Sequence, residues 1–232
     1  MKEDTESWCS PAGIFFDLWY PLLDHEKDLI SRSIDIRHYN KNDIIYRIGD
    51  PTLYIMYVME GRVKIYRNTD DGRPKIIRIF CDKQFFSYRA FFAGDAYTTN
   101  CIAIDDSKII TFPTNVIARL VDGNKTIMRY FFKELAKGLG MSDYRIVSLA
   151  QKHLRGRLAE TLLFLSKSFG TDSSGWIHGK ITRSDIANLA NMTTSNAIGT
   201  LAEFRREGII ETDGKKIKIR EPEKLVFISG KE

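Results

Sequence analysis

The stretch from residue 181 to residue 210 constrains this chain most, because it fits two short helices joined by a tight turn. Thr182 is a good helix N-cap, and Asp185, three residues later, completes a capping-box-like pair. Asn191 falls where the helices would meet, and Asn tolerates the left-handed backbone of a sharp turn. Thr193 can cap the second helix. The pattern is typical of a helix-turn-helix, whose second helix can lie in the DNA major groove.

Apolar side chains recur at helical spacing in both predicted helices, and the second helix ends at Gly208. We expect these side chains to face a common core, and an ordinary pair of packed helices remains the alternative for this stretch. The expected core positions are Ile186, Leu189 and Ala190 in the first helix and Ala197, Ile198, Leu201 and Phe204 in the second.

Two strand-like runs, Ile209–Thr212 and Lys216–Ile219, follow the second helix and flank Asp213-Gly214, a strong hairpin signal. A helix-turn-helix followed by such a hairpin makes a winged helix. Lys215 and Lys216 at the exposed tip suit phosphate contacts, which position a protein without reading sequence. Double-stranded DNA is therefore the leading candidate partner.

The charge of the chain supports this interpretation. Its formal net charge is +5, and the stretch from residue 152 onward holds 14 Lys and Arg against 10 Asp and Glu. Residues 1–151 hold 21 against 20, so the excess coincides with the predicted DNA reader.

The three cysteines, Cys9, Cys81 and Cys101, are far apart and show no Cys/His metal spacing. They predict free thiols rather than a disulfide framework or a metal site, and one chain lacks the four ligands that an iron–sulfur cluster uses. No signal segment opens the sequence, and no apolar run approaches about 18 residues. We expect a cytoplasmic protein without a membrane span or a resident cofactor.

Residues 36–112 consist of short β-rich runs separated by turn signals, and two short helices, Ile14–Tyr20 and His25–Ser33, precede them. Many short strands at this spacing predict a small antiparallel β-barrel or jelly roll. The predicted strands are Ile44–Tyr46, Tyr54–Met59, Arg62–Arg67, Lys75–Phe80, Thr99–Ile104 and Lys108–Phe112.

A short helix from Thr114 and a long helix from Lys125 to about Leu149 come next, followed by a polar joint, His153–Arg157, and a helix over Leu158–Phe169. In the long helix, apolar positions alternate at spacings of four and three, a coiled-coil-like seam that predicts a homodimer. The alternative is that this helix packs only on its own barrel. The seam consists of Met128, Phe132, Leu135, Leu139, Ser142, Ile146 and Leu149.

Taken in this order, the chain resembles Crp/Fnr-type transcription regulators. The resemblance is carried by Gly49-Asp50 with Tyr54–Val58, by Glu60–Ile65, by Asp71-Gly72, by Gly156–Leu163 and by the helix-turn-helix. It implies an α+β chain with a cyclic-nucleotide-binding-like sensor domain over residues 1–123. It also implies a dimerisation helix over 124–151 and a winged helix DNA-binding domain over 152–232.

The residues that would hold cAMP depart from the family pattern. In cAMP-binding members a Gly-Glu pair and an Arg-Ser pair hold the ribose and the cyclic phosphate. Here Ser87 and Tyr88 stand at the first pair, and Thr98 and Thr99 at the second. A buried phosphate without its Arg lacks its main countercharge, so we expect no tight cAMP binding. Arg89 could serve a different anion or form an exposed salt bridge, and any small-molecule effector stays unidentified.

The predicted recognition helix departs as well. Family members often place an Arg or Glu early and an Arg one turn later, where this chain has Thr194, Ser195 and Asn196 early and Gly199 later. Asn196 could pair with adenine or could cap backbone groups, and Thr194 could touch a thymine methyl. The resemblance further implies phosphate contacts from Thr182, Arg183 and Ser184, with Thr193 beside them.

The leading hypothesis is thus a homodimeric, sequence-specific regulator of transcription, with RNA polymerase as a candidate partner. Whether it activates or represses depends on where its site lies and on contacts with the polymerase. A small-molecule-binding module whose winged helix mediates protein contacts is the alternative. The sequence contains no GxSxG, Walker-type loop or HExxH motif, so an enzyme is not expected.

Overall fold

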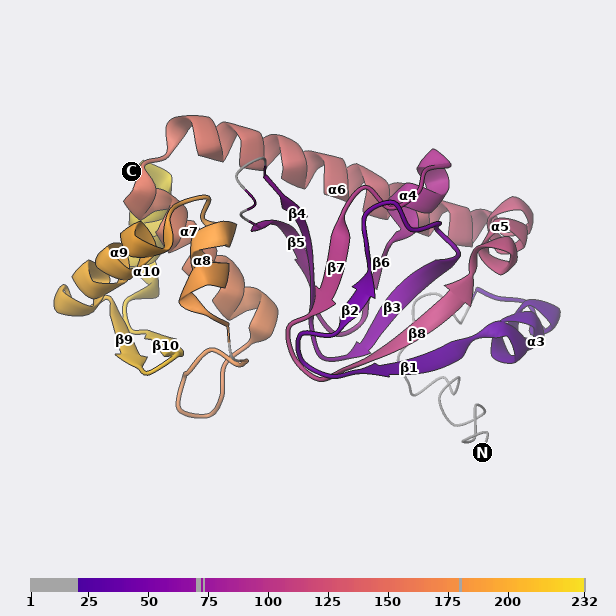
Figure 1. The fold of residues 1–232 in the computed structure, drawn as a ribbon, viewed down its shortest axis with the longest axis horizontal. Coiled ribbons are helices and arrows are strands. Elements are labelled where there is room, and N and C mark those ends of the chain that lie inside the picture. The colour runs from indigo at the N-terminus through magenta and orange to yellow at the C-terminus, as the bar shows by residue number, and fades with distance from the viewer. Residues whose placement is uncertain (1–20, 70–71, 73, 180, 232) are drawn as a thin grey trace. The chain divides into compact units, whose positions relative to one another are not determined.

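The computed structural model describes residues 21–69, 72, 74–179 and 181–231 (Figure 1). The predicted helix over 14–20 and Cys9 lie outside the described residues. By its contacts the chain divides into two compact units. The first comprises Met1–Ile65 with Ile79–Gly140, and the second comprises Tyr66–Arg78 with Met141–Glu232.

The strands form two four-stranded sheets, ordered β1-β8-β3-β6 and β2-β7-β4-β5, which confirms the predicted jelly-roll-like β-fold. Every predicted run corresponds to a strand, whereas β1 and the three-residue β6 were not predicted because neither shows clear alternation. The bounds are β1 Asp35–Tyr39, β2 Ile44–Tyr46, β3 Tyr54–Glu60, β4 Val63–Asn68, β5 Pro74–Phe80, β6 Gln84–Phe86, β7 Asn100–Ala103 and β8 Ser107–Pro113.

One core cluster fills the space between strands of both sheets. Val58, Phe86 and Ile109, from β3, β6 and β8, have no exposed surface, and Cys101 of β7 is buried beside them. Strand β3 is buried over five consecutive residues, because Met56 and Val58 pack in this cluster while the alternate residues Ile55, Tyr57 and Met59 pack in a second cluster. Burial raises the pKa of the Cys101 thiol above its usual range, so this cysteine is a buried thiol as predicted.

A second cluster lies under three helices: α3 (Asp24–Ser33), α5 (Thr114–Gly123) and the start of α6 (Lys125–Gln151). Ile127 and Phe131 are the residues through which α6 enters this core. The Phe131 ring is 1% exposed and lies 5.4–5.9 Å from the rings of four other aromatic residues. The alternative that α6 packs on its own barrel is thus correct for its first turns.

The predicted seam of α6 lies beside this buried face. Met128 and Leu135 are partly buried, and Leu135 packs against the second cluster. Farther along the helix, Leu139 and Ile146 are 65% and 66% exposed. Phe132, Ser142 and Leu149 are also exposed.

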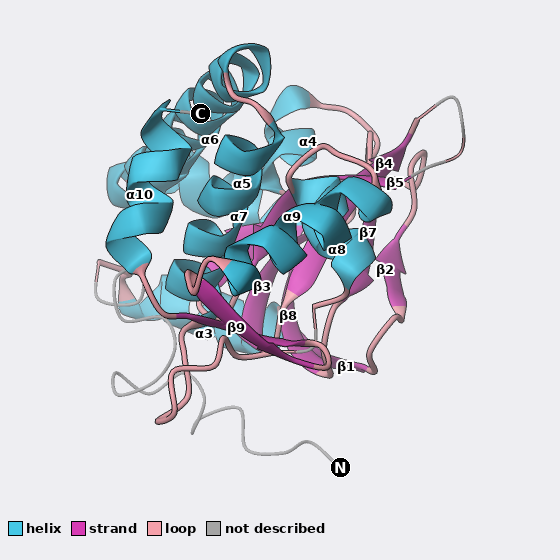
Figure 2. Ribbon diagram, turned by 90° about the vertical axis from the view of Figure 1, so that its left-hand side faces the viewer, coloured by secondary structure: helices cyan, strands magenta, loops and turns pink. Residues whose placement is uncertain are grey.

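The second unit contains the C-terminal helices α7 (Leu154–Phe169), α8 (Arg183–Leu189), α9 (Thr194–Arg206) and α10 (Pro222–Lys231). Helix α7 begins four residues earlier than predicted, because His153 already acts as its N-cap and the joint is shorter than expected. Helix α10 was not predicted, although Pro222 stands at its first position, where a missing N–H costs nothing. It packs mainly on α7 (Figure 2).

The variant Phe131→Ala should lower the free energy of unfolding by about 3–5 kcal/mol, since it removes a fully buried ring from the second cluster. Phe131→Leu keeps most of the volume and should cost less than about 1.5 kcal/mol. Urea denaturation followed by fluorescence measures both. Equal, small effects for the two variants would contradict the packing of α6 on this core.

Candidate nucleic-acid interface

Helix α8 begins with the predicted capping box. The Thr182 hydroxyl accepts a hydrogen bond from the Asp185 amide at 3.0 Å and donates to Asp185 Oδ2 at 2.7 Å. The Thr182 amide donates back to the same carboxylate at 3.3 Å. Two amides at the start of the helix are thereby satisfied, and the Thr182 hydroxyl proton is already directed at Asp185. Ser184, in the first turn, is exposed.

The turn between α8 and α9 has the left-handed residue that the sequence predicts, because Asn191 adopts φ +50°. Two arginines hold the carbonyl oxygens of this turn. Arg145 of α6 donates to the Leu189 carbonyl at 3.0 Å, and Arg157 of α7 donates to the Asn191 carbonyl at 3.0 Å. Cations at a helix C-terminus also complement its dipole. The sequence analysis missed both contacts, since neither Arg has a partner nearby in sequence.

Arg145 joins this turn to strand β5. Its guanidinium also donates to the carbonyl oxygens of Ile76 at 2.9 Å and Ile77 at 2.7 Å. Burial lowers the pKa of Arg145, and the charge of Glu160 opposes that shift. Three backbone carbonyls therefore stabilise one largely desolvated cation within the second unit.

Helix α9 is capped by Thr193, whose hydroxyl accepts from the Asn196 amide at 3.2 Å, as predicted. Its first turn is open to solvent: Thr194, Ser195 and Asn196 are all exposed, and so is Gly199 one turn later. The predicted DNA-reading residues thus share one accessible part of the helix.

The prediction that Ile198 lies in the core is wrong. Its side chain is 51% exposed, whereas Ala197, Leu201 and Phe204 are buried as expected. The physical reason is helical geometry, because Ile198 lies about 100° around the helix from Ala197. Thr200 occupies the buried position instead and is 8% exposed.

The wing is formed by β9 (Ile210–Asp213) and β10 (Lys216–Ile219), which pair in antiparallel register with Asp213 opposite Lys216. The two-residue turn is therefore Gly214-Lys215, one residue later than the predicted centre, and Gly214 has φ +52°. Lys215 and Lys216 are exposed at this tip.

Arg183 ties the wing to α8 in the structure. Its guanidinium donates to the carbonyl oxygens of Gly214 at 3.0 Å and Lys215 at 3.4 Å, and burial lowers its pKa. The sequence suggested a phosphate contact at this position, whereas the structure gives the side chain a positioning role. A phosphate contact from Arg183 stays a prediction.

The loop before α8 adds a further segment to the wing. Trp176 forms a bridge with Lys218, and the Ile177 amide donates to the Ile217 carbonyl at 2.9 Å. The Lys218 ammonium lies 6.0 Å from the Trp176 ring centroid. No sequence signal marked this pairing, because a single bridge needs no alternating pattern.

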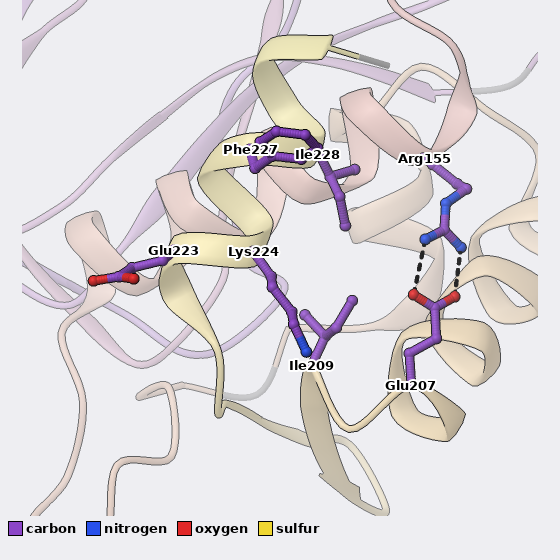
Figure 3. Close-up of a pocket in the computed structure, with 7 residues that line it drawn as sticks. All are labelled: Arg155, Glu207, Ile209, Glu223, Lys224, Phe227 and Ile228. Carbon is purple, nitrogen blue, oxygen red and sulfur yellow. Dashed lines mark hydrogen bonds and ion pairs between the residues drawn. The ribbon is translucent and has the colours of Figure 1, made fainter.

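The far end of α9 is fixed to α7 by Arg155. Its guanidinium pairs with both carboxylate oxygens of Glu207 at 2.9 and 3.0 Å (Figure 3). It also pairs with Glu203 at 3.1 Å. Arg155 and Glu207 border a pocket of about 650 Å³ that α10 also lines with Lys224 and Phe227 (Figure 3).

The five candidate effector residues lie directly before, in and after α4 (Tyr88–Ala93), in the first unit. Ser87, at the family's Gly position, adopts φ +68°, the backbone that Gly favours, and donates to the Tyr54 carbonyl at 2.9 Å. Tyr88 is 4% exposed within the second cluster. Arg89 is exposed and donates to the Thr98 hydroxyl. Thr99 is partly buried.

An aromatic pair occupies the interior near these residues. Tyr46 and Tyr97 stack with ring centroids 3.8 Å apart, and the Tyr97 hydroxyl donates to the Tyr54 carbonyl at 3.1 Å. Burial raises the pKa of Tyr97 to about 12, so its phenol stays protonated near neutral pH.

Two known domain families match this chain. Residues 36–124 match the family of the cyclic nucleotide-binding domain, and residues 156–228 match the Crp-like helix-turn-helix domain. Together the two matches, in this order, cover more than half of the chain. The chain belongs to the Crp/Fnr family of transcription regulators.

Relatives of this Crp/Fnr regulator include a CRP-like cAMP-activated global transcriptional regulator from Mycobacterium tuberculosis. It is 24% identical over 183 residues, which cover 78% of this chain and 82% of the relative. The Electron transport regulator A of Shewanella oneidensis is 26% identical over 211 residues, covering 90% of this chain and 82% of the relative.

The fold agrees with solved structures of the family. A putative Crp/Fnr regulator from Eubacterium rectale matches with a TM-score of 0.76 and 22% identity, covering 93% of this chain and 99% of that one. FixK2 from Bradyrhizobium japonicum matches with a TM-score of 0.75 and 21% identity, covering 84% and 96%.

The residues that the structure describes form neither a metal-binding cluster nor a membrane-spanning helix. No group of three or more His, Cys, Asp and Glu residues there could hold a metal ion. No helix in the same part of the chain is long and apolar enough to cross a membrane.

Replacing Arg145 with Met keeps the length of the side chain and leaves three carbonyls without their donor. We expect the free energy of unfolding to fall by about 2–4 kcal/mol and amide exchange to accelerate in the turn between α8 and α9. Urea denaturation and hydrogen–deuterium exchange measure the two effects. Arg119→Met, at an exposed position of α5, is the control. Unchanged exchange at the turn in Arg145→Met would show that this guanidinium does not hold it.

Proposed function

We propose that this Crp/Fnr regulator binds double-stranded DNA as a homodimer and reads a two-fold symmetric site. The observation that carries the proposal is the open first turn of α9 beside a lysine-bearing wing. Thr193 fixes the start of the helix, and Arg183 holds the wing turn against α8. A recognition helix and a phosphate-binding tip are thus positioned by contacts that use only backbone atoms of Asn196, Gly214 and Lys215 and leave the Asn196 and Lys215 side chains out.

Each exposed residue has a proposed role. Thr194, Ser195 and Asn196 would approach base edges, with Gly199 allowing the backbone to come close. A Cβ at Gly199 would meet nothing within 4 Å in the free protein, so the space beside it is open. Lys215, Lys216 and Ser184 would contact phosphates, which set register but carry no sequence information.

The seam of α6 supports the homodimer. Phe132, Leu139 and Ile146 are each more than 60% exposed in the isolated chain, although they are large and apolar. Their spacing of seven residues is that of a coiled-coil position, so a second copy of α6 would cover them. Two such chains would present their recognition helices about 34 Å apart, one turn of the DNA.

We further propose that cAMP is not the effector, in contrast to the Mycobacterium tuberculosis relative, whose name describes it as cAMP-activated. Tyr88 is committed to the core, and Arg89 donates to Thr98 rather than standing free for a phosphate. We expect a cytoplasmic regulator rather than an enzyme, with RNA polymerase as a partner if it activates.

The first test is selection of bound sequences from random duplex DNA, using purified protein without added nucleotide. We expect a two-fold symmetric motif and an affinity that cAMP changes by less than about twofold. Because phosphate contacts release counterions, affinity should fall steeply between about 50 and 200 mM salt. No enrichment with or without cAMP, or after adding cell extract, would refute DNA binding and favour a module for protein contacts.

The variant Leu139→Glu tests the dimer, since two copies would bury facing carboxylates in the seam. Its dimer dissociation constant, measured by sedimentation, should rise at least about 30-fold, and affinity for a full symmetric site should fall with it. Lys137→Glu places the same side chain outside the seam, at a 54% exposed position, and should leave the dimer intact. An unchanged dimer in Leu139→Glu would exclude this helix as the interface.

A further inference from the structure

The middle of the recognition helix presents one large aliphatic side chain to solvent. Ile198 is 51% exposed and lies one turn after Thr194 and one turn before Ala202. A single exposed isoleucine is common on protein surfaces and means little alone. Its place in α9 is what makes it informative.

The residues next to Ile198 on its own side of α9 are all short. Ser195 and Thr194 precede it, Gly199 follows it, and Ala202 lies on the next turn. Ile198 therefore reaches farther from the helix axis than any of these four side chains. If this part of α9 lies in the major groove, Ile198 reaches the bases before these four side chains do.

An aliphatic side chain can recognise only one feature of the major groove. The C5-methyl group of thymine is the apolar group displayed there, and the other base edges are hydrogen-bond donors or acceptors. Against a G·C pair, Ile198 would remove water from polar edges and return no hydrogen bond, which is unfavourable. Against thymine, the same side chain buries a methyl group.

We propose that Ile198 is a specificity-determining residue that packs on a thymine methyl in each half-site of the operator. The inference rests on the proposed DNA-binding function and adds to it the base that this position selects. It also gives a physical reason for Gly199, since a long side chain there would hold the helix away from the groove.

Deoxyuridine tests this inference, because it keeps every hydrogen-bonding group of thymine and lacks only the methyl. The operator obtained by selection is rebuilt with each thymine replaced in turn, and affinities are measured for wild type and Ile198→Ala. At one thymine per half-site, wild type should lose about fourfold in affinity, the equivalent of burying one methylene-sized group, and about fifteen-fold when both half-sites are changed.

Ile198→Ala should bind the unmodified operator more weakly by a similar factor and should no longer respond to deoxyuridine at that position. Because the side chain is half exposed, the variant should fold normally, which circular dichroism checks. Val226→Ala, at a 58% exposed position on α10, is the matched control and should keep the wild-type response. Thr194→Ser removes one methyl from the preceding turn and shows which side chain makes the contact, because a deoxyuridine response that depends on Ile198 is lost in Ile198→Ala and not in this variant.

Three results would overturn the inference. Wild type could bind the selected operator without responding to deoxyuridine at any position. Ile198→Ala could retain the wild-type response, or Thr194→Ser could abolish it, which would assign the methyl contact to Thr194. In each case a symmetric operator has been found, so the proposed function stands. Failure to select any operator would instead count against the proposed function itself.

Discussion

The Arg145 guanidinium links strand β5 to the end of α8, and this link fixes the direction in which α9 leaves the turn. Arg145 is largely desolvated, and its hydrogen bonds go to backbone carbonyls of β5 and of the end of α8. Desolvating a cation is costly, so the arrangement is stable only while these carbonyls remain in place. Arg157 holds the next carbonyl group in the same turn. The direction of α9 therefore depends on the two arginines as well as on packing.

How much of this could be predicted from the sequence depends on the range of the interactions. The caps at Thr182 and Thr193, the left-handed Asn191 and the hairpin of the wing rest on contacts between residues a few positions apart, and they were predicted correctly. The jelly-roll strands were predicted because turn signals separate them. The roles of Arg145 and Arg183 depend on contacts between residues 31 to 69 positions apart, so no local pattern reports them.

Helices α9 and α6 show the limit of periodicity. Ile198 fits an apolar stripe in the sequence, yet the helix turns it toward solvent while Thr200 is buried. On α6 the apolar residues are numerous enough for two stripes, and spacing alone cannot say which one contacts the barrel. Ile127 and Phe131 enter the core, whereas Leu139 and Ile146 do not. The family resemblance supplied the order of domains but could not assign these faces.

The segment Tyr66–Arg78 belongs by its contacts to the unit formed mostly by residues after 140. The bonds from Arg145 to Ile76 and Ile77 accordingly span 69 and 68 positions. Closing a loop of that length has an entropic cost before any contact is made, so such contacts form late. During synthesis the two carbonyls of β5 emerge long before their donor does. The second unit is therefore completed only when its later residues reach a piece of β-structure that was made much earlier.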